Sequence, residues 1–202
     1  MLTLYDNALV MYDALITYLK NLSTTPLSEA DIEIIKATYV PKRIRKRQYF
    51  LQEGEVCKYA AFIVKGAMRQ YTVDDKGVEH VARLFIENWF VSDRESWVKL
   101  TPSIYNIDAW EDSDVLLLTY ANHLSTLNIP AITEATLKLN EKLSIANQKR
   151  LNSISLSAEE RYADLLKTYP EFIQRFPQHI IASYLGVAKE TISRIRSYAA
   201  KK

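Results

Sequence analysis

The chain has 202 residues, of which 48% are hydrophobic and 25% are charged, and its formal net charge is +2. That length allows one or two domains with a hydrophobic core. It contains only four glycines, one cysteine and three histidines. These counts exclude a glycine-rich dinucleotide or P-loop motif, a disulfide framework and a four-cysteine iron–sulfur cluster. Because the histidines are far apart in the sequence, we expect neither a metal site nor a cofactor.

Targeting and membrane segments are not expected. The N-terminus has no basic segment followed by an apolar run, which is the pattern of a signal peptide. No stretch approaches eighteen uncharged apolar residues, the length that a membrane-spanning helix requires. The sequence therefore predicts a soluble, cytoplasmic protein without a membrane partner.

Helical and strand-like patterns follow one another in blocks. Apolar residues at helical spacing predict a helix over residues 5–21, and a second helix begins at Ser28 and is closed by Pro41. Four short apolar or alternating runs follow, separated by turn signals: 59–64, 68–73, 81–91 and 115–120. Short strands at this spacing predict an antiparallel sandwich or barrel over about residues 42–122.

After Pro130 the pattern is helical again over residues 132–155, with apolar residues on two sides of the helix. One line consists of Leu139, Leu143 and Ala146, and the other of Leu137, Ile145, Leu151 and Ile154. A helix that is apolar on two sides is expected to be buried on both. In one interpretation, one side of the helix covers the sandwich and the other side packs against a second copy of the chain. In the alternative, the helix is a core helix of one subunit.

The C-terminal part begins with a capping box, Ser157 with Glu160, which predicts a helix to about Thr168 that Pro170 stops. A separate helical unit follows from Pro177. Its residues 182–195 fit a helix–turn–helix, in which a small residue is needed where two helices cross and a glycine in the tight turn. The expected core of this motif is Ala182, Leu185, Gly186, Ile192 and Ile195.

The other face of the second helix is polar. It carries Lys189, Glu190, Ser193, Arg194 and Arg196, and such side chains read base edges and bind phosphates in the major groove. Residues 189–202 contain five basic side chains against one acidic one, a net charge of +4, so the remaining residues of this +2 chain carry −2. The alternative is an amphipathic hairpin with a solvated basic face. A second basic run, at residues 42–47, is interpreted as a solvated strand face.

Several of these motifs resemble the Crp/Fnr family of bacterial transcription regulators over nearly the whole chain. The pair Gly54-Glu55, the segment 62–66, and Gly77 with Glu79 resemble that family's cyclic-nucleotide-binding-type β-roll, and the segment 189–195, which includes Thr191, is similar to its recognition helix. The resemblance implies an α+β fold. It implies N-terminal helices with an antiparallel, jelly-roll-like β-roll sensor domain over 1–130, a long dimerisation helix over 131–156, and a helix–turn–helix DNA-binding domain over 157–202.

The resemblance also implies a homodimer that pairs through the long helix and binds a two-fold symmetric DNA site. In the matching positions, Lys189, Glu190 and Arg194 would read the bases. An effector in the β-roll, where one exists, would reorient the DNA-binding domains. Because the chain stops seven residues after Ile195, we expect no β-hairpin wing after the recognition helix.

The sequence departs from the family's cyclic-nucleotide members, which have a Gly-Glu pair followed by an Arg-Ser/Thr-Ala triplet. The matching positions are Ser92-Asp93 and 103–105, where no cation replaces the arginine. Burying a phosphate without a paired cation is costly, so we do not expect cyclic AMP to bind. The aromatic residues of this region predict a filled core or a pocket for an apolar effector. The candidate pocket residues are Asp93, Arg94, Ser103 and Tyr105.

The leading hypothesis is a homodimeric, sequence-specific DNA-binding transcription regulator whose β-roll takes an unknown small-molecule effector or none. The alternative is a ligand-binding sensor or scaffold whose C-terminal hairpin binds a protein partner. No nucleophile–base or carboxylate pair occurs at local spacing, so we do not expect an enzyme.

Overall fold

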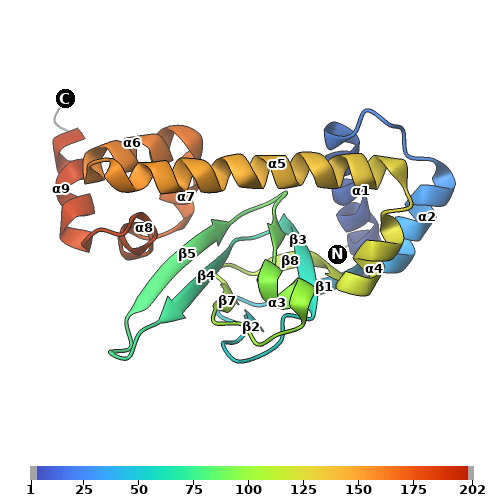
Figure 1. Cartoon of the computed structure of the whole chain (residues 1–202), viewed down its shortest axis with the longest axis horizontal. Helices are drawn as coiled ribbons and strands as arrows, with labels where there is room; N and C mark the ends of the chain where they lie inside the picture. Colours follow the sequence, from blue (N-terminus) through green and yellow to red (C-terminus); the bar gives the residue numbers. More distant parts are fainter. Residues whose placement is uncertain (1–3, 200–202) are drawn as a thin grey trace. The chain divides into compact units, whose positions relative to one another are not determined.

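The computed structural model describes residues 4–199 of the chain (Figure 1). Contacts between residues divide the chain into two compact units. The first comprises the chain up to Met68 together with Phe85–Ser144, and the second comprises Arg69–Leu84 together with the chain from Ile145 onward. Each unit therefore combines segments that are distant in the sequence.

Helices occupy both ends of the described chain, and their bounds agree with most of the predicted helices. Those that begin in the first unit are α1 (Leu4–Leu22), α2 (Glu29–Thr38), α3 (Arg94–Lys99), α4 (Tyr120–Thr126) and α5 (Pro130–Asn152). Those of the second unit are the 3-10 turn Ser153–Ser155, α6 (Ala158–Thr168), α7 (Pro170–Arg175), α8 (Gln178–Leu185) and α9 (Lys189–Ala199). The short helices α3, α4 and α7 were not predicted.

The strands form two four-stranded sheets, with the orders β1-β8-β3-β6 and β2-β7-β4-β5. Their bounds are β1 Val40–Ile44, β2 Tyr49–Leu51, β3 Tyr59–Lys65, β4 Met68–Val73, β5 Glu79–Phe85, β6 Phe90–Val91, β7 Asn106–Ala109 and β8 Ser113–Thr119. The pairs β1–β8, β2–β7, β3–β6 and β3–β8 are all antiparallel. The structure thus confirms the predicted α+β fold with an antiparallel β-roll.

Two local predictions in this region need correction. Pro41 does not close α2, which ends three residues earlier; it lies in β1, an edge strand, where the missing N–H of proline leaves no ladder bond unmade. The predicted run 81–91 is two strands, because the chain turns between them at Asn88, whose φ is +66° and whose N–H donates to the carbonyl of Ile63 at 2.9 Å.

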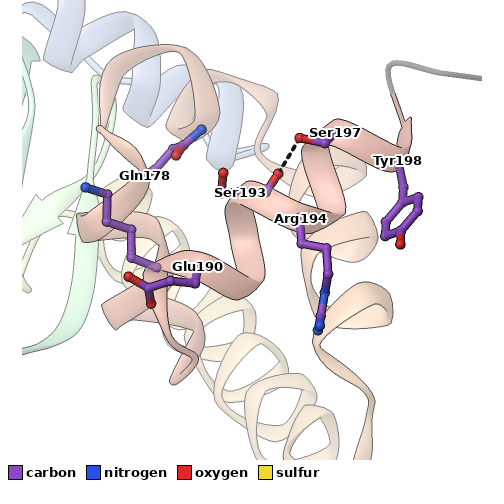
Figure 2. A pocket seen from close by; sticks show the side chains of 7 residues that line it. Gln178, Glu190, Ser193, Arg194, Ser197 and Tyr198 are labelled. Carbon is purple, nitrogen blue, oxygen red and sulfur yellow. Dashed lines mark hydrogen bonds between the residues drawn. The ribbon is translucent and has the colours of Figure 1, made fainter.

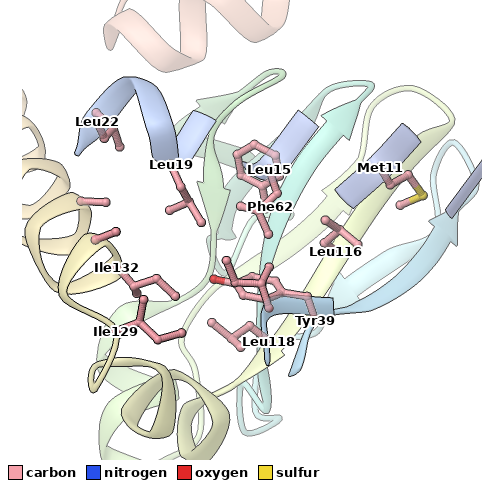
Figure 3. Close-up of a cluster of buried hydrophobic side chains, with 13 residues drawn as sticks. Met11, Leu15, Leu19, Leu22, Tyr39, Phe62, Leu116, Leu118, Ile129 and Ile132 are labelled. Carbon is pink, nitrogen blue, oxygen red and sulfur yellow. The ribbon is translucent and has the colours of Figure 1, made fainter. Parts of the chain in front are cut away.

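The first unit contains two clusters of buried apolar side chains. In one, shown in Figure 3, α1 packs on the sheet through Leu15 and Leu19, which meet Phe62 of β3 and Leu116 of β8, while Ile132 joins from the start of α5. Phe62 and Leu116 are also cross-strand partners in the register of β3 and β8. The second cluster contains Ile44, Leu51, Ile63, Met68, Phe85, Val91, Ile107 and Val115 among others. Phe62 and Ile63, neighbours on β3, belong to different clusters, so both faces of that strand are buried.

Helix α5 does not meet the expectation that both of its apolar lines are buried within one subunit. Its buried residues are Ala131, Ile132 and Ala135, all in the first turns. Leu139 and Leu143 are half-buried and Ala146 is exposed. Leu137, Ile145, Leu151 and Ile154 are 50–72% exposed. Only the start of the helix enters the core, so the interpretation of α5 as a core helix of a single subunit is wrong.

A capping box and a proline mark the starts of α6 and α7 in the second unit. Ser157 and Glu160 form the predicted capping box of α6, in which each side chain binds the other residue's backbone N–H. Pro170 does more than stop that helix: it is the first residue of α7, a position where its missing N–H costs nothing. Within the described residues, no helix is both long and apolar enough to cross a membrane, and no cluster of metal-binding side chains occurs.

Candidate nucleic-acid interface

The turn between α8 and α9 has the geometry that a helix–turn–helix requires. Gly186 is in the left-handed conformation, with φ +66° and ψ +38°, and follows the last residue of α8. Its N–H donates to the carbonyl of Ser183 at 3.0 Å, and the N–H of Val187 donates to the carbonyl of Ala182 at 2.9 Å. These two bonds form a Schellman motif, which ends α8 and turns the chain into α9. The position thus favours glycine for the predicted reason.

The predicted core residues of this motif differ in burial. Ala182 and Ile192 are 2% and 1% exposed, whereas Leu185 and Ile195 are only half-buried and Gly186 lies at the surface in the turn. The sequence analysis missed the residues that support them from α6 and α7. These are Tyr162, Leu165, Phe172 and Phe176, all 7% exposed or less. The apolar residues of the short α7 were a signal that could have found them.

Helix α9 has the polar face that the sequence predicts. Lys189, Glu190, Ser193, Arg194 and Arg196 are exposed, and Thr191 is half-buried. The helix begins with Lys189, so the first two of these residues lie in its first turn. Ile192 on the opposite side is buried. The alternation anchors one side of α9 and leaves the other open to solvent.

Part of this face lines a groove of about 530 Å³. Figure 2 shows Glu190 and Arg194 projecting from α9, with Gln178 contributed by α8. The full lining is Gln178, Lys189, Glu190, Ser193, Arg194, Ser197 and Tyr198. Four of the six predicted DNA contacts are thus brought together here, while Thr191 and Arg196 are not part of the lining. Gln178, Ser197 and Tyr198 were not predicted, although Ser197 and Tyr198 follow Ser193 and Arg194 at the four-residue helical spacing.

The charged side chains of this groove are available to an outside partner. Among the described residues, the structure records no ion pair for Lys189, Glu190 or Arg194. By contrast, the hydroxyl of Ser197 already donates to the carbonyl of Ser193 at 3.0 Å. A groove with two cations, one carboxylate and several hydroxyls offers both donors and acceptors to a polar ligand.

No family model matches the sequence, and no curated protein matches it either. Solved structures do match. FixK2 from Bradyrhizobium japonicum is 19% identical, with a TM-score of 0.65 over 81% of this chain and 85% of that one. CLP from Xanthomonas campestris, described as a c-di-GMP-responsive global regulator, is 16% identical, with a TM-score of 0.64 over 86% of this chain and 92% of its own. A protein from Eubacterium rectale, described as a transcriptional regulator of the Crp/Fnr family, is 18% identical, with a TM-score of 0.62 over 85% and 83%.

The chain has the fold of the Crp/Fnr regulators. At these identities the likeness is one of fold, and it confirms the fold that the sequence motifs predicted. Function lies in the sites placed on a fold rather than in the fold itself. The roles of the residues in the groove therefore depend on their own chemistry.

The four candidate pocket residues lie on α3 or next to it in the sequence, and their polar groups bond within the first unit. Asp93 is 8% exposed, and its carboxylate caps α3 by accepting from the N–H of Glu95 at 3.2 Å. Arg94 is exposed and donates to Asn140 of α5 at 3.0 Å. These contacts do not bring the two side chains together as a phosphate site.

The other two candidates lie in the loop that follows α3. The hydroxyl of Ser103 accepts from the N–H of Tyr105 at 3.0 Å and donates to its carbonyl at 3.3 Å. Ser103 is 3% exposed and Tyr105 is half-buried. Neither position supplies a cation, as the sequence already indicated.

Aromatic side chains of the first unit pack against one another in two groups. The ring of Phe90 lies 5.1 Å from that of Phe62 and 6.2 Å from that of Tyr18. Trp97 packs edge-on to Tyr120 at 5.1 Å. His123 lies 5.3 Å from Trp97, and its pKa is lowered, first by burial and then by the charge of Arg94. Phe90 and Trp97 lie close in the sequence to Asp93 and Arg94, so this part of the first unit includes packed aromatic side chains.

Proposed function

We propose that the protein is a homodimeric, sequence-specific DNA-binding transcription regulator. Residues 157–202 form its DNA-binding domain, residues 131–156 its linking and pairing helix, and residues 1–130 a sensor-like domain. The single observation that supports it most strongly is the groove on α9, which is lined by exposed Lys189, Glu190 and Arg194 and where residues 4–199 form no recorded ion pair with them. The α8–α9 turn presents this face as a helix–turn–helix does.

In this proposal, each side chain of α9 has a role that follows from its chemistry. Arg194 presents a fork of donors that matches the two acceptors of guanine in the major groove, and Glu190 accepts from the amino group of cytosine. Lys189, at the start of the helix, binds guanine or a phosphate. Thr191, Ser193 and Arg196 donate to phosphates and fix the position of the helix on the DNA.

The dimer is proposed to pair through α5. Apolar side chains exposed on a helix surface favour burial against a partner, and a second copy of the same helix matches them by symmetry. Two lines are available, one with Leu139, Leu143 and Ala146 and the other with Leu137 and Ile145. A two-fold dimer would place its two α9 helices in half-sites about 34 Å apart or a multiple of this distance.

Selection of bound sequences from a random DNA pool tests the function directly. We expect a palindromic consensus, which would establish both sequence specificity and two-fold symmetry. Binding should also weaken steeply with salt because phosphate contacts release counterions. Failure to enrich any sequence, together with salt-insensitive capture of a protein partner, would support the alternative of a sensor or scaffold with a protein-binding hairpin.

Light scattering tests the dimer, and two substitutions separate its two candidate lines. We expect the wild type to be dimeric at micromolar concentration. Leu143→Glu should give monomers if the first line forms the interface, and Ile145→Glu if the second does. A monomeric wild type would contradict pairing through α5.

We further propose that the β-roll does not bind cyclic AMP. The positions that match the family's phosphate-binding triplet, 103–105, carry no cation, and Arg94 is engaged with Asn140. Phe90 and Trp97, which lie on either side of Asp93 in the sequence, are packed against other aromatic rings. Calorimetric titration with cyclic AMP should show no binding at millimolar concentrations, and saturable binding would contradict this part of the proposal.

A further inference from the structure

The outer edge of β5 is bound by a side chain of the helix–turn–helix. Strand β5 is the last strand of its sheet, so one row of its backbone groups has no neighbouring strand. The hydroxyl of Ser183, on α8, accepts from the N–H of Val81 at 2.9 Å and donates to the carbonyl of Glu79 at 2.9 Å. Ser183 thus satisfies a donor and an acceptor that a further strand would otherwise pair.

Two further contacts in the second unit join this strand to the helices. Arg150, near the end of α5, donates to the carbonyl of Ala82, and its guanidinium lies 5.0 Å from the centre of the Tyr184 ring on α8. Arg83 donates to the side-chain carbonyl of Asn147 at 3.3 Å. The bond of Ser183 is therefore part of a continuous contact along β5.

The strand that Ser183 binds is itself held firmly. Arg69 of β4 pairs with the carboxylate of Glu79 through both of its terminal nitrogens, and its guanidinium lies 4.2 Å from the centre of the Tyr71 ring. The β4–β5 turn is closed by the side chain of Asp74, which accepts from the N–H of Val78 at 2.9 Å. A braced hairpin gives the helix–turn–helix a fixed surface to bind.

We propose that Ser183 is a positioning residue, whose hydroxyl holds the helix–turn–helix on the edge of β5 in the orientation that binds DNA. The DNA part of this inference rests on the proposed function. The contact does not cover the reading face, because Lys189, Glu190 and Arg194 are exposed while it is made. Holding the unit in place beforehand reduces the conformational freedom that DNA binding must remove.

The test compares Ser183→Ala, Ser183→Thr and the control Ser125→Ala in the full chain. Ser125 is exposed and donates only to the carbonyl of Asn122 on its own helix, at 2.8 Å. The hydrogen-exchange rate of the Val81 amide shows directly whether its bond to Ser183 is formed. We expect exchange about tenfold faster in Ser183→Ala, a rate near that of the wild type in Ser183→Thr, and no change in Ser125→Ala, because only the alanine at position 183 removes the acceptor of that N–H.

Measurement of the dissociation constant for DNA tests the positioning role. The probe is a duplex of the sequence selected from the random pool. We expect the dissociation constant to rise about three- to tenfold in Ser183→Ala, roughly the effect of losing one net hydrogen bond, and to be restored in Ser183→Thr. Unchanged exchange at Val81 would show that the contact is not made in solution. Faster exchange with unchanged or tighter DNA binding would overturn the positioning role.

The two proposals fail differently. If the wild type selects no DNA sequence, the proposed function fails and the positioning role fails with it, but exchange at Val81 still reports whether Ser183 binds the strand. If the wild type selects a sequence and Ser183→Ala binds it as well as the wild type does, the function stands and the positioning role falls.

Discussion

The side chains on α9 and those around α3 differ in how far the chain satisfies them. Around α3, Asp93 caps a helix, Arg94 bonds to Asn140, and Ser103 bonds to the backbone of its own loop. On α9, Lys189 and Arg194 are exposed and form no ion pair that the structure records among its described residues. The polar groups of the first region bond within the chain, whereas Lys189 and Arg194 are exposed to solvent.

The difference lies in the side chains and not in the fold, which matches that of the Crp/Fnr regulators. The sheets and α3 are present, but positions 103–105 carry no cation, and Trp97 of α3 packs against Tyr120. The comparison predicts that substitutions in the first region change stability, whereas substitutions on α9 change binding.

The largest effect is expected from Gly66→Ala in the first unit. The backbone of Gly66 has a φ of +107°, and a Cβ there would lie 2.7 Å from the Cα of Ser113 and 2.8 Å from the carbonyl of Asp112. Backbone atoms cannot move aside as a flexible side chain can. The overlap of the added Cβ with these atoms therefore adds to the strain of the positive φ. We expect the free energy of unfolding to fall by about 3 kcal/mol or more, measured by chemical denaturation.

Gly77→Ala is the matched control for that substitution. Gly77 also has a positive φ, +77°, but no atom lies within 4 Å of an added Cβ. Only the backbone strain remains, and we expect the free energy of unfolding to fall by about 1–2 kcal/mol. If both substitutions lowered the free energy of unfolding equally, close packing around Gly66 would not be the cause of the effect of Gly66→Ala.

A smaller effect, on binding alone, is expected from Arg194→Ala. If Arg194 makes a bidentate contact with guanine, its loss should reduce discrimination between the selected sequence and random DNA by about 1–3 kcal/mol. Because the side chain is exposed, the free energy of unfolding should change by less than about 0.5 kcal/mol. Competition binding with both DNAs, beside a denaturation curve, measures the two quantities.

Arg196→Ala serves as the control on the same helix. Arg196 is also exposed but does not line the groove, and we expect it to contact phosphate. Its loss should weaken binding to selected and random DNA alike. If Arg194→Ala also weakened binding to both DNAs equally, Arg194 would not be a base-reading residue, and the contrast between α9 and the α3 region would concern charge alone.

The sequence predicted the local features whose cause is local. The turn at Gly186, the helix start at Ser28 and the capping box at Ser157 each depend on a few neighbouring residues, and all three are present. The features that were missed depend on distant contacts. Helix α7 is stabilised by packing of Phe172 with Phe176 and Tyr184, and six residues carry too little periodicity to show it.

The candidate site was predictable to a similar extent. Four of the groove's seven lining residues follow from the polar face of α9, and Ser197 and Tyr198 could have been added by continuing the same spacing. Gln178 could not, because it reaches the groove only through the packing of α8 against α9. The contact of Ser183 with β5 was equally hidden, since about a hundred residues separate its partners.

The smallest expected effect is that of Glu134→Gln, which tests a partly exposed contact in the first unit. The carboxylate of Glu134 at the start of α5 pairs with Lys138 at 2.7 Å and accepts from the hydroxyl of Ser23 at 2.7 Å and the N–H of Thr24 at 2.9 Å. Together these partners lower the pKa of Glu134 well below its ordinary value of 4.5, and the bond with Lys138 contributes most. The amide of Gln carries no charge, so we expect the Tm to fall by a few degrees at pH 7.

The pH dependence of that difference identifies the charge as its cause. A carboxyl whose pKa is lowered by folding stabilises the folded state above its unfolded pKa, and this contribution is lost as the pH falls toward the folded pKa. The difference in Tm between the wild type and Glu134→Gln should therefore be largest above pH 5 and should decrease progressively below about pH 4.5. The exposed Glu141 on the same helix gives the control, since Glu141→Gln should leave the Tm nearly unchanged at pH 7. A gap that stayed constant down to pH 3 would mean that neutral hydrogen bonds, and not the charge, account for the contact.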